Sequence, residues 1–168
     1  DLIHPAARGE RGHNYYAWNI STPEDKDRYA ALFSCLAEVF DGRHGMGHIG
    51  NYLIGNEVNA HSQWHYTGSD SLKENAYLYA DTFQIVNSAV QDKCANARVS
   101  ICLEHSWTTK IAGRVHAGRD FLDTFAERLE EYGSPDFTIS YHAYSEPLTQ
   151  ADFWNNSSER VKDSVDSP

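Results

Sequence analysis

The chain has 168 residues, 40% of them hydrophobic and 12% aromatic, a composition typical of one globular domain with a hydrophobic core. Fourteen Lys and Arg stand against 24 Asp and Glu, and the net charge of -10 would repel the phosphate backbone of a nucleic acid. No apolar run approaches the roughly 20 residues of a membrane-spanning helix. Residues 1–5 lack the layout of a secretory signal, so any signal has been removed or lies upstream. We therefore expect neither a nucleic acid nor a membrane as partner.

The first predicted elements are a strand and a helix. Residues 15–20 (YYAWNI) form a short aromatic and apolar run, which predicts a strand. Thr22 and Pro23 supply an N-cap hydroxyl and a proline at the first helical position, which predicts that a helix begins there. The apolar positions of this helix step by three and four from Tyr29 onward, and Gly42 provides the stop.

A second strand and helix follow a glycine-rich loop. Residues 52–55 (YLIG) are too few for a helix and lack polar alternation, which predicts a strand buried on both faces. Ser71 and Glu74 have the spacing of a capping box, and an apolar stripe from Leu72 to Val90 has a nearly helical period. These signals predict a helix that begins after Ser71.

The last predicted elements are two strands with a helix between them. Residues 98–103 (RVSICL) are rich in β-branched side chains, and residues 137–141 (FTISY) form a fourth strand. Between them, apolar positions from Phe121 to Leu129 indicate a helix that Gly133 stops. Strands that alternate with helices imply a parallel sheet with right-handed connections.

Two architectures suit such a sheet, a doubly wound open sheet and a (β/α) barrel. No glycine-rich nucleotide motif follows any strand, which favours the barrel. A complete eight-stranded barrel runs to about 250 residues, and four strands can be counted here. We therefore expect residues 1–168 to form a single partial domain of the α/β class, a segment of a (β/α)8 TIM barrel with about four parallel strands and intervening helices.

Functional groups of parallel α/β folds lie at the carboxyl ends of the strands, where the loops converge. All four predicted strands are apolar but end in polar and aromatic residues. These ends are Trp18-Asn19, Asn56-Glu57-Val58-Asn59, Glu104-His105-Ser106-Trp107 and Tyr141-His142-Ala143-Tyr144. Carboxylates and amides suit sugar hydroxyls, and flat rings suit the apolar faces of pyranoses, so the strand ends predict a carbohydrate site on one rim.

The segment at residues 54–60 (IGNEVNA) resembles the Gly-Asn-Glu segment that ends the fourth strand of clan A retaining glycoside hydrolases. The fuller set of YYAWN, LIGNEVNA, ARVSICLEHSW, SYHAY and FWN resembles DUF5722, a bacterial family. The resemblance implies that the four strands are the third to sixth of a barrel and that Glu57 is the general acid/base. It also implies that Asn56 hydrogen-bonds the sugar 2-hydroxyl and that His142 and Tyr144 line the subsite beside the nucleophile.

A retaining glycosidase needs two carboxyl groups about 5 to 5.5 Å apart, one protonated and one ionised. The clan places its nucleophile, a glutamate, at the end of the seventh strand, before which this chain stops, so we expect no glycosidase activity from this chain alone. Glu104 and Glu146 are further rim carboxylates, for which a structural or hydrogen-bonding role is favoured over a catalytic one. Glu57 is the predicted catalytic residue, and no metal or cofactor is expected. The predicted substrate-binding residues are Asn19, Asn56, Asn59, His105, Trp107, His142 and Tyr144.

Several side chains also have a structural interpretation. Asn56 and Glu57 could cap a strand end, and Trp64, Trp107 and Trp154 could pack the rim. Two histidine pairs have the four-residue spacing of helical metal ligands but lack an H-E-x-x-H motif, so we expect exposed loop histidines. These pairs are His44 with His48 and His61 with His65. The three cysteines lack C-x-x-C spacing and are expected to be buried thiols: Cys35, Cys94 and Cys102.

The sequence thus predicts part of a secreted or cell-surface bacterial hydrolase that acts with retention on β-linked polysaccharide or oligosaccharide. Two alternatives stay open. One is a metal-dependent barrel hydrolase that uses the nine histidines, and the other is a catalytically inactive barrel that binds sugar through its Trp and Tyr rim. A four-stranded segment leaves open sheet edges, so two copies are expected to pair as a homodimer.

Overall fold

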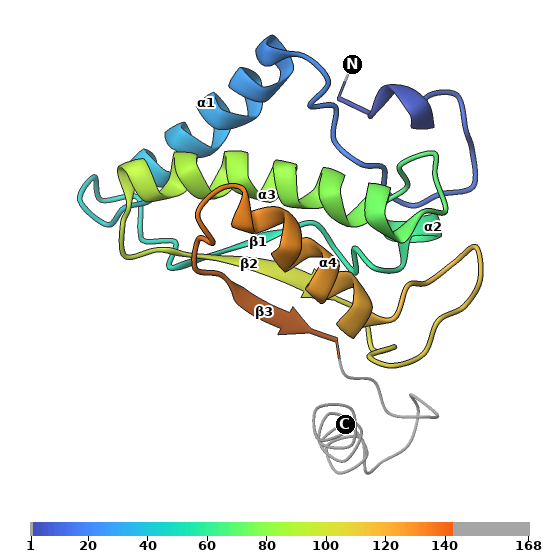
Figure 1. The fold of residues 1–168 in the computed structure, drawn as a ribbon. Coiled ribbons are helices and arrows are strands. Elements are labelled where there is room, and N and C mark those ends of the chain that lie inside the picture. The colour runs from blue at the N-terminus through green and yellow to red at the C-terminus, as the bar shows by residue number, and fades with distance from the viewer. Residues whose placement is uncertain (1, 143–168) are drawn as a thin grey trace, which may run out of the picture.

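The computed structural model describes residues 2–142. These residues form a mixed α/β fold in which helices alternate with three strands (Figure 1). The elements in chain order are η1 (Pro5–Ala7), α1 (Pro23–Val39), β1 (Asn51–Ile54), α2 (His61–Trp64), α3 (Leu72–Lys93), β2 (Arg98–Leu103), α4 (Gly118–Glu130) and β3 (Thr138–Tyr141).

The three strands form one open parallel sheet in the order β1-β2-β3. Ile54 lies beside Ile101, and Ile101 beside Ile139, so the three strands end at nearly the same level. The last three predicted strands and their parallel direction are therefore confirmed. Because the connections α3 and α4 step in one direction across the sheet, both helices lie on the same face, as right-handed crossovers require.

The predicted first strand, residues 15–20, is not a strand of this sheet. The segment is extended, but it forms only isolated bridges, from Tyr16 to Tyr66 and from Trp18 to Ile3. Its backbone hydrogen bonds thus go to the N-terminal segment and to the loop after α2, which the local pattern of residue types does not reveal. Among residues 2–142 the sheet has three strands and not four.

The helices begin where the capping signals predict. Thr22 Oγ1 accepts a hydrogen bond from the Asp25 backbone N–H at 3.2 Å, and Pro23 follows at the first helical position of α1. Ser71 Oγ accepts from the Glu74 N–H at 3.3 Å at the start of α3. The predicted third helix corresponds to α4.

The hydrophobic core lies between the sheet and the helices. α3 packs between α1 and α4, and the apolar side chains of the strands face these helices. Ile54, Ile101 and Leu103 are buried there against Phe83 of α3 and Phe125 of α4, whose rings meet edge to face at 5.3 Å. Burial of such aliphatic and aromatic side chains is the dominant stabilising contribution to the fold.

The opposite face of the sheet carries polar side chains and no described helix. Ser100 lies in the middle of this face, and its hydroxyl contacts Asn51 Oδ1 on β1, at 2.6 Å, and Thr138 Oγ1 on β3. Leu53, on the same face, is 48% exposed. The prediction that β1 is buried on both faces is therefore wrong for the described residues, because all the helices that contact this sheet lie on one side.

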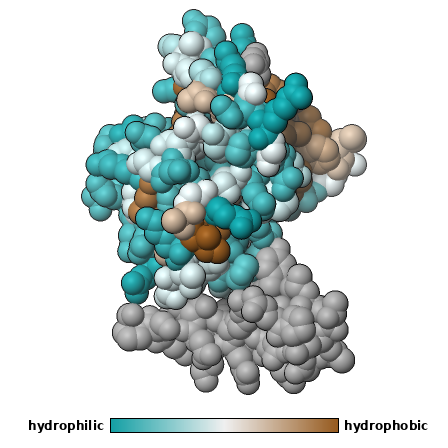
Figure 2. All heavy atoms as spheres, turned by 90° about the vertical axis from the view of Figure 1, so that its right-hand side faces the viewer, coloured by the Kyte–Doolittle hydropathy of each residue, from teal (hydrophilic) through white to brown (hydrophobic). Residues whose placement is uncertain are grey.

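The surface and the cysteines complete the fold. Seen from the side toward which the strands point, the described surface is mostly hydrophilic with a few separate apolar areas (Figure 2).

Cys102 is buried in β2 as predicted, but Cys35 on α1 is exposed and Cys94 is half-buried. Cys35 stands on the part of α1 that faces away from the core, so the prediction of three buried thiols is wrong.

Candidate active site

The candidate site is built on the turn that follows β1. Gly55 has a φ of 79°, in the left-handed region, and a Cβ there would lie 2.8 Å from Val58 Cγ1. Glu57 also lies in this region, with a φ of 45°, which is unfavourable for a residue with a side chain of this size. The Val58 N–H donates to the Cys102 carbonyl of β2 at 3.0 Å, which ties the turn to the neighbouring strand.

Glu57 points toward the end of β3. Its carboxylate Oε1 lies 2.8 Å from His142 Nδ1, and the side chains of Glu57 and His142 are 10% and 31% exposed. The His142 backbone N–H donates to the Leu103 carbonyl, so the parallel ladder continues to the residue that holds Glu57. Glu57 thus combines a left-handed backbone conformation with a nearly buried carboxylate that contacts His142 at the end of another strand. Strained arrangements of this kind gather at functional sites.

His142 has a second partner that the sequence analysis missed. Its Nε2 lies 3.3 Å from the Sγ of Cys102, so the imidazole stands between a thiol and a carboxylate. Burial raises the pKa of the Cys102 thiol above its ordinary value. The signal was present in the strand pattern, since Cys102 pairs with Ser140 and alternation places Ser140 and His142 on one face.

A pocket beside Glu57 has aromatic walls. Tyr15, Asn56, Glu57 and Trp64 line a hollow of about 370 Å³. The rings of Tyr15 and Trp64 are 5.6 Å apart and inclined at 43°. A larger neighbouring pocket of about 510 Å³ shares Tyr15, Asn56 and Trp64, and reaches Trp18. The structure thus brings Glu57, Asn56 and two aromatic rings to one hollow.

Asn59 and Glu104 form a buried clamp between the ends of β1 and β2. Asn59 Oδ1 accepts from the Glu104 N–H at 2.9 Å, and Asn59 Nδ2 donates to Glu104 Oε1 at 3.3 Å and to the His116 carbonyl at 3.0 Å. Glu104 Oε1 also accepts from the Ser106 N–H at 2.7 Å. The other carboxylate oxygen lies 2.8 Å from His105 Nδ1. The structure therefore places His105 beside Glu104.

The remaining predicted residues lie in different places. Asn19 is buried at the start of α1, where its amide donates to Asp25 Oδ2 at 3.0 Å. Trp107 packs edge to face on Tyr141 at 6.0 Å and lies close to Gly118, at the start of α4. Three further predicted rim residues lie outside the described residues: Tyr144, Glu146 and Trp154.

His61 and His65 are buried, so the prediction that both are exposed is wrong. The α2 loop, which comprises α2 and the residues up to α3, packs against the N-terminal segment and α3. Within it, His61 stacks on His116 with ring centres 4.2 Å apart. Burial, together with the neighbouring His61, lowers the pKa of His65 and of His116 to about 4. The other pair, His44 and His48, is exposed as predicted.

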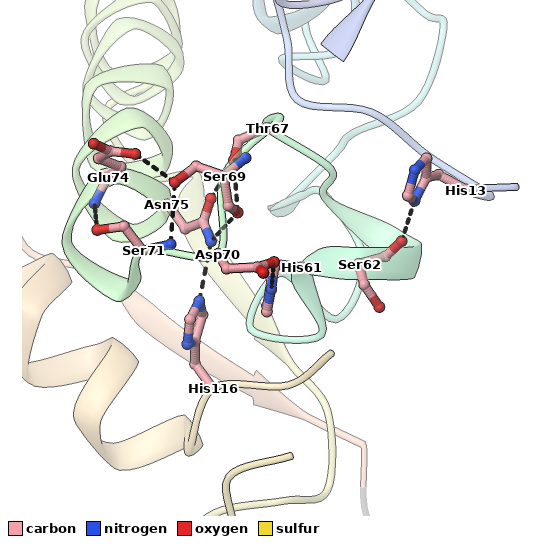
Figure 3. Close-up of polar contacts among 10 residues, drawn as sticks. All are labelled: His13, His61, Ser62, Thr67, Ser69, Asp70, Ser71, Glu74, Asn75 and His116. Atoms are coloured by element: carbon pink, nitrogen blue, oxygen red, sulfur yellow. Dashed lines mark hydrogen bonds and ion pairs between the residues drawn. The ribbon is translucent and has the colours of Figure 1, made fainter. Parts of the chain in front are cut away.

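A polar network holds this loop in place (Figure 3). His61 Nε2 lies 3.2 Å from Asp70 Oδ1, and Asn75 Nδ2 lies 3.0 Å from His116 Nε2. The Thr67 hydroxyl contacts the Asn75 amide oxygen, and so connects the loop to α3. Because Trp64 sits on the same loop, the network also fixes the aromatic wall of the pocket.

Residues 2–142 contain neither a cluster of metal ligands nor a membrane-spanning helix. No three His, Cys, Asp or Glu side chains of this range are placed to hold a metal ion together. None of its helices combines the length and the apolar character needed to cross a bilayer.

Comparison with known proteins identifies the family. The model of a protein family described as "Family of unknown function (DUF5722)" matches residues 1–168. No curated protein sequence matches the chain significantly. Because the family match spans the whole chain, this protein belongs to the DUF5722 family.

Proposed function

We propose that this chain carries the acid/base part of a glycoside hydrolase-like site, with Glu57 as the general acid/base acting on β-linked oligosaccharide or polysaccharide. One observation carries the proposal. Glu57 is a nearly buried carboxylate at the carboxyl end of a parallel strand, held by His142 from another strand end and open to a hollow walled by Tyr15 and Trp64.

A (β/α)8 barrel segment is the architecture proposed for this site. The described sheet is parallel, its strands follow one another in space as in sequence, and its helices lie on one face. In a barrel the helices form the outer ring, and the other face of each strand points inward. Cys102 and His142 lie on this helix-free face, as groups of a barrel mouth would.

The chemistry proposed for Glu57 is proton transfer in two steps. As an acid it gives its proton to the glycosidic oxygen, and as a carboxylate it then takes a proton from the water that releases the sugar. The second carboxylate, which attacks the anomeric carbon, is assigned to a further strand end. Glu104 is an unsuitable candidate because its Oε1 already accepts from Asn59 and Ser106.

The hollow beside Glu57 suits one sugar ring. Trp64 and Tyr15 offer flat apolar surfaces, and Asn56 offers an amide for a hydroxyl group. Asn59 and Asn19 use their amides on protein groups, so we assign them to positioning the site. Association of two copies and a location outside the cell stay predictions.

The test compares Glu57→Gln with Glu130→Gln, an exposed carboxylate on α4, in the intact protein. On unactivated β-linked oligosaccharides, Glu57→Gln should lower turnover by a factor on the order of 10² to 10⁴, as loss of a general acid does. Aryl glycosides with good leaving groups need no proton, so their cleavage should fall much less. Glu130→Gln should behave as the unmodified protein on both substrates.

Binding supplies an independent readout. Trp64→Ala should weaken binding of the same oligosaccharides in titration calorimetry about fivefold, because a lost aromatic contact amounts to roughly 1 kcal/mol. Equal loss of turnover on both substrate classes in Glu57→Gln would contradict the acid/base role. Sugar binding without turnover would favour the inactive sugar-binding barrel, and tightly bound zinc in elemental analysis would favour the metal-dependent hydrolase.

A further inference from the structure

Three chemically active side chains lie in line on the helix-free face of the sheet. Cys102 Sγ is 3.3 Å from His142 Nε2, and His142 Nδ1 is 2.8 Å from Glu57 Oε1. The three residues come from β2, from the end of β3 and from the turn after β1. Each neighbouring pair is within hydrogen-bonding reach, so the placement of protons at Cys102 constrains their placement at Glu57.

The hydrogen-bond partners of the Cys102 sulfur indicate which atom donates and which accepts in its contact with His142. The Glu57 backbone and the Ser140 side chain both bond Cys102 and lower the pKa of its thiol, as donors to the sulfur would. A sulfur that accepts from these two groups has its own proton left to donate to His142 Nε2, which lies 3.3 Å away. A neutral imidazole that accepts at Nε2 carries its own proton on Nδ1, and this N–H donates to Glu57.

The surroundings keep the thiol in its neutral form. Burial is the main effect that raises the pKa of Cys102, and the Glu57 charge raises it further. Tyr79 of α3 interacts with Cys102 electrostatically from the helix side of the sheet, and burial raises the pKa of Tyr79 well above its ordinary value. Tyr79 therefore stays a neutral phenol, and Glu57 and His142 are the titratable groups connected to this thiol by direct contacts.

We propose that Cys102 is a positioning residue for Glu57, because its thiol, by donating to Nε2, acts together with the carboxylate to favour the Nδ1-protonated form of His142 and thereby orients a donor at the carboxylate. This inference rests on the proposed function of Glu57. When Glu57 takes up one proton, its O–H donates to His142 Nδ1, the ring carries its proton on Nε2, and this N–H donates to the sulfur. The two arrangements differ by one proton, and in each of them one ring nitrogen of His142 donates and the other accepts.

The test uses Cys102→Ser, Cys102→Ala and, as a control, Cys35→Ala on the exposed face of α1. A serine hydroxyl donates and accepts as a thiol does, whereas alanine does neither. The first readout is the pair of ¹⁵N shifts of His142 in histidine-labelled protein at pH 7. We expect protonation at Nδ1 in the unmodified protein, in Cys102→Ser and in Cys35→Ala, and a mixture of both ring forms in Cys102→Ala.

The second readout is the pH dependence of turnover. In Cys102→Ala the basic limb, which reports the loss of the Glu57 proton, should move to higher pH by roughly half to one unit, the equivalent of one neutral hydrogen bond, and Cys102→Ser should restore it. Circular dichroism verifies that the variants fold. Unchanged ring forms in folded Cys102→Ala would overturn the inference.

Alkylation distinguishes this arrangement from a nucleophilic thiol. Peptide mass spectrometry after iodoacetamide treatment at pH 7 should show slow modification of Cys102 and fast modification of Cys35. Fast, His142-dependent modification of Cys102 would identify a thiolate and overturn the inference. Because the ¹⁵N shifts need no substrate, they decide the role of Cys102 even where Glu57→Gln leaves turnover unchanged, a result that refutes only the proposed function.

Discussion

Mild acid should destabilise this protein through two buried histidines. Burial lowers the pKa of His65 and His116 to about 4, from an ordinary value of 6.5. Both rings are therefore neutral in the folded protein between these values, whereas the unfolded chain binds a proton at each. As the pH falls from 6.5 toward 4, proton binding to the unfolded chain therefore lowers the free energy of unfolding. This contribution is absent above pH 6.5.

The size of the effect follows from the two pKa values. Between pH 7 and pH 5 each histidine should lower the free energy of unfolding by about 2 kcal/mol, and both together by about 4 kcal/mol. A loss of this size is a large share of the 5 to 15 kcal/mol of an ordinary domain, taken as an order of magnitude. The fold leaves these charges poorly compensated, since the nearby His61 disfavours protonation of both rings.

Urea unfolding at pH 8, 7, 6 and 5 measures this dependence directly. In His65→Gln/His116→Gln the free energy of unfolding should fall much less between pH 7 and pH 5 than in the unmodified protein, because neither glutamine titrates. His48→Gln changes an exposed histidine and serves as the matched control, for which the slope should stay unchanged. Equal slopes in the double variant and the unmodified protein would refute the assignment of acid sensitivity to these two rings.

Two further changes test the backbone of the site and of the loop beside it. Glu57→Asn should be more stable to urea than Glu57→Gln by about 0.5 to 1 kcal/mol, because asparagine tolerates the φ of 45° better; equal stabilities would contradict backbone strain at Glu57. Gly68→Ala should loosen the N-terminal segment, since Gly68 has a φ of 85° and a Cβ there would lie 2.5 Å from the Ala6 carbonyl oxygen. Faster limited proteolysis before α1 is the expected result, and unchanged cleavage would show that the contact is dispensable.

Local signals sufficed for the three long helices and for three of the four predicted strands. Thr22 and Ser71 cap α1 and α3 as predicted, because capping depends on groups three residues apart. The residues 98–103 form β2 with the bounds expected from their β-branched side chains. Parallel pairing also followed, since connections long enough for a helix return each strand in the same direction.

Contacts between distant segments were beyond the local pattern. Residues 15–20 have the composition of a strand, yet their partners Ile3 and Tyr66 are chosen by the way two loops meet. His61 and His65 lack an H-E-x-x-H motif, which predicts an exposed loop, yet both are buried. His61 stacks on the distant His116, and His65 lies near His4 of the N-terminal segment. In the site, Cys102 is the partner of Ser140, and alternation along β3 places His142 on the same face of the sheet. The parallel register therefore contained the proximity of Cys102 and His142, but the prediction considered only polar groups at the strand ends.

The register of the sheet explains why the polar groups meet at one end. Ile54 and Ile101 are partners at equal height, so the turn with Glu57 follows β1 beside the end of β2, and the hydrogen bond from Val58 to Cys102 is possible. This bond, the left-handed turn and His142 together hold Glu57 in a conformation that its own backbone preference disfavours. Such strain persists where the surroundings over-determine it, and a chain under no functional constraint would place glycine or asparagine there at lower free energy. The unfavourable backbone conformation of Glu57 therefore supports the role proposed for its carboxylate.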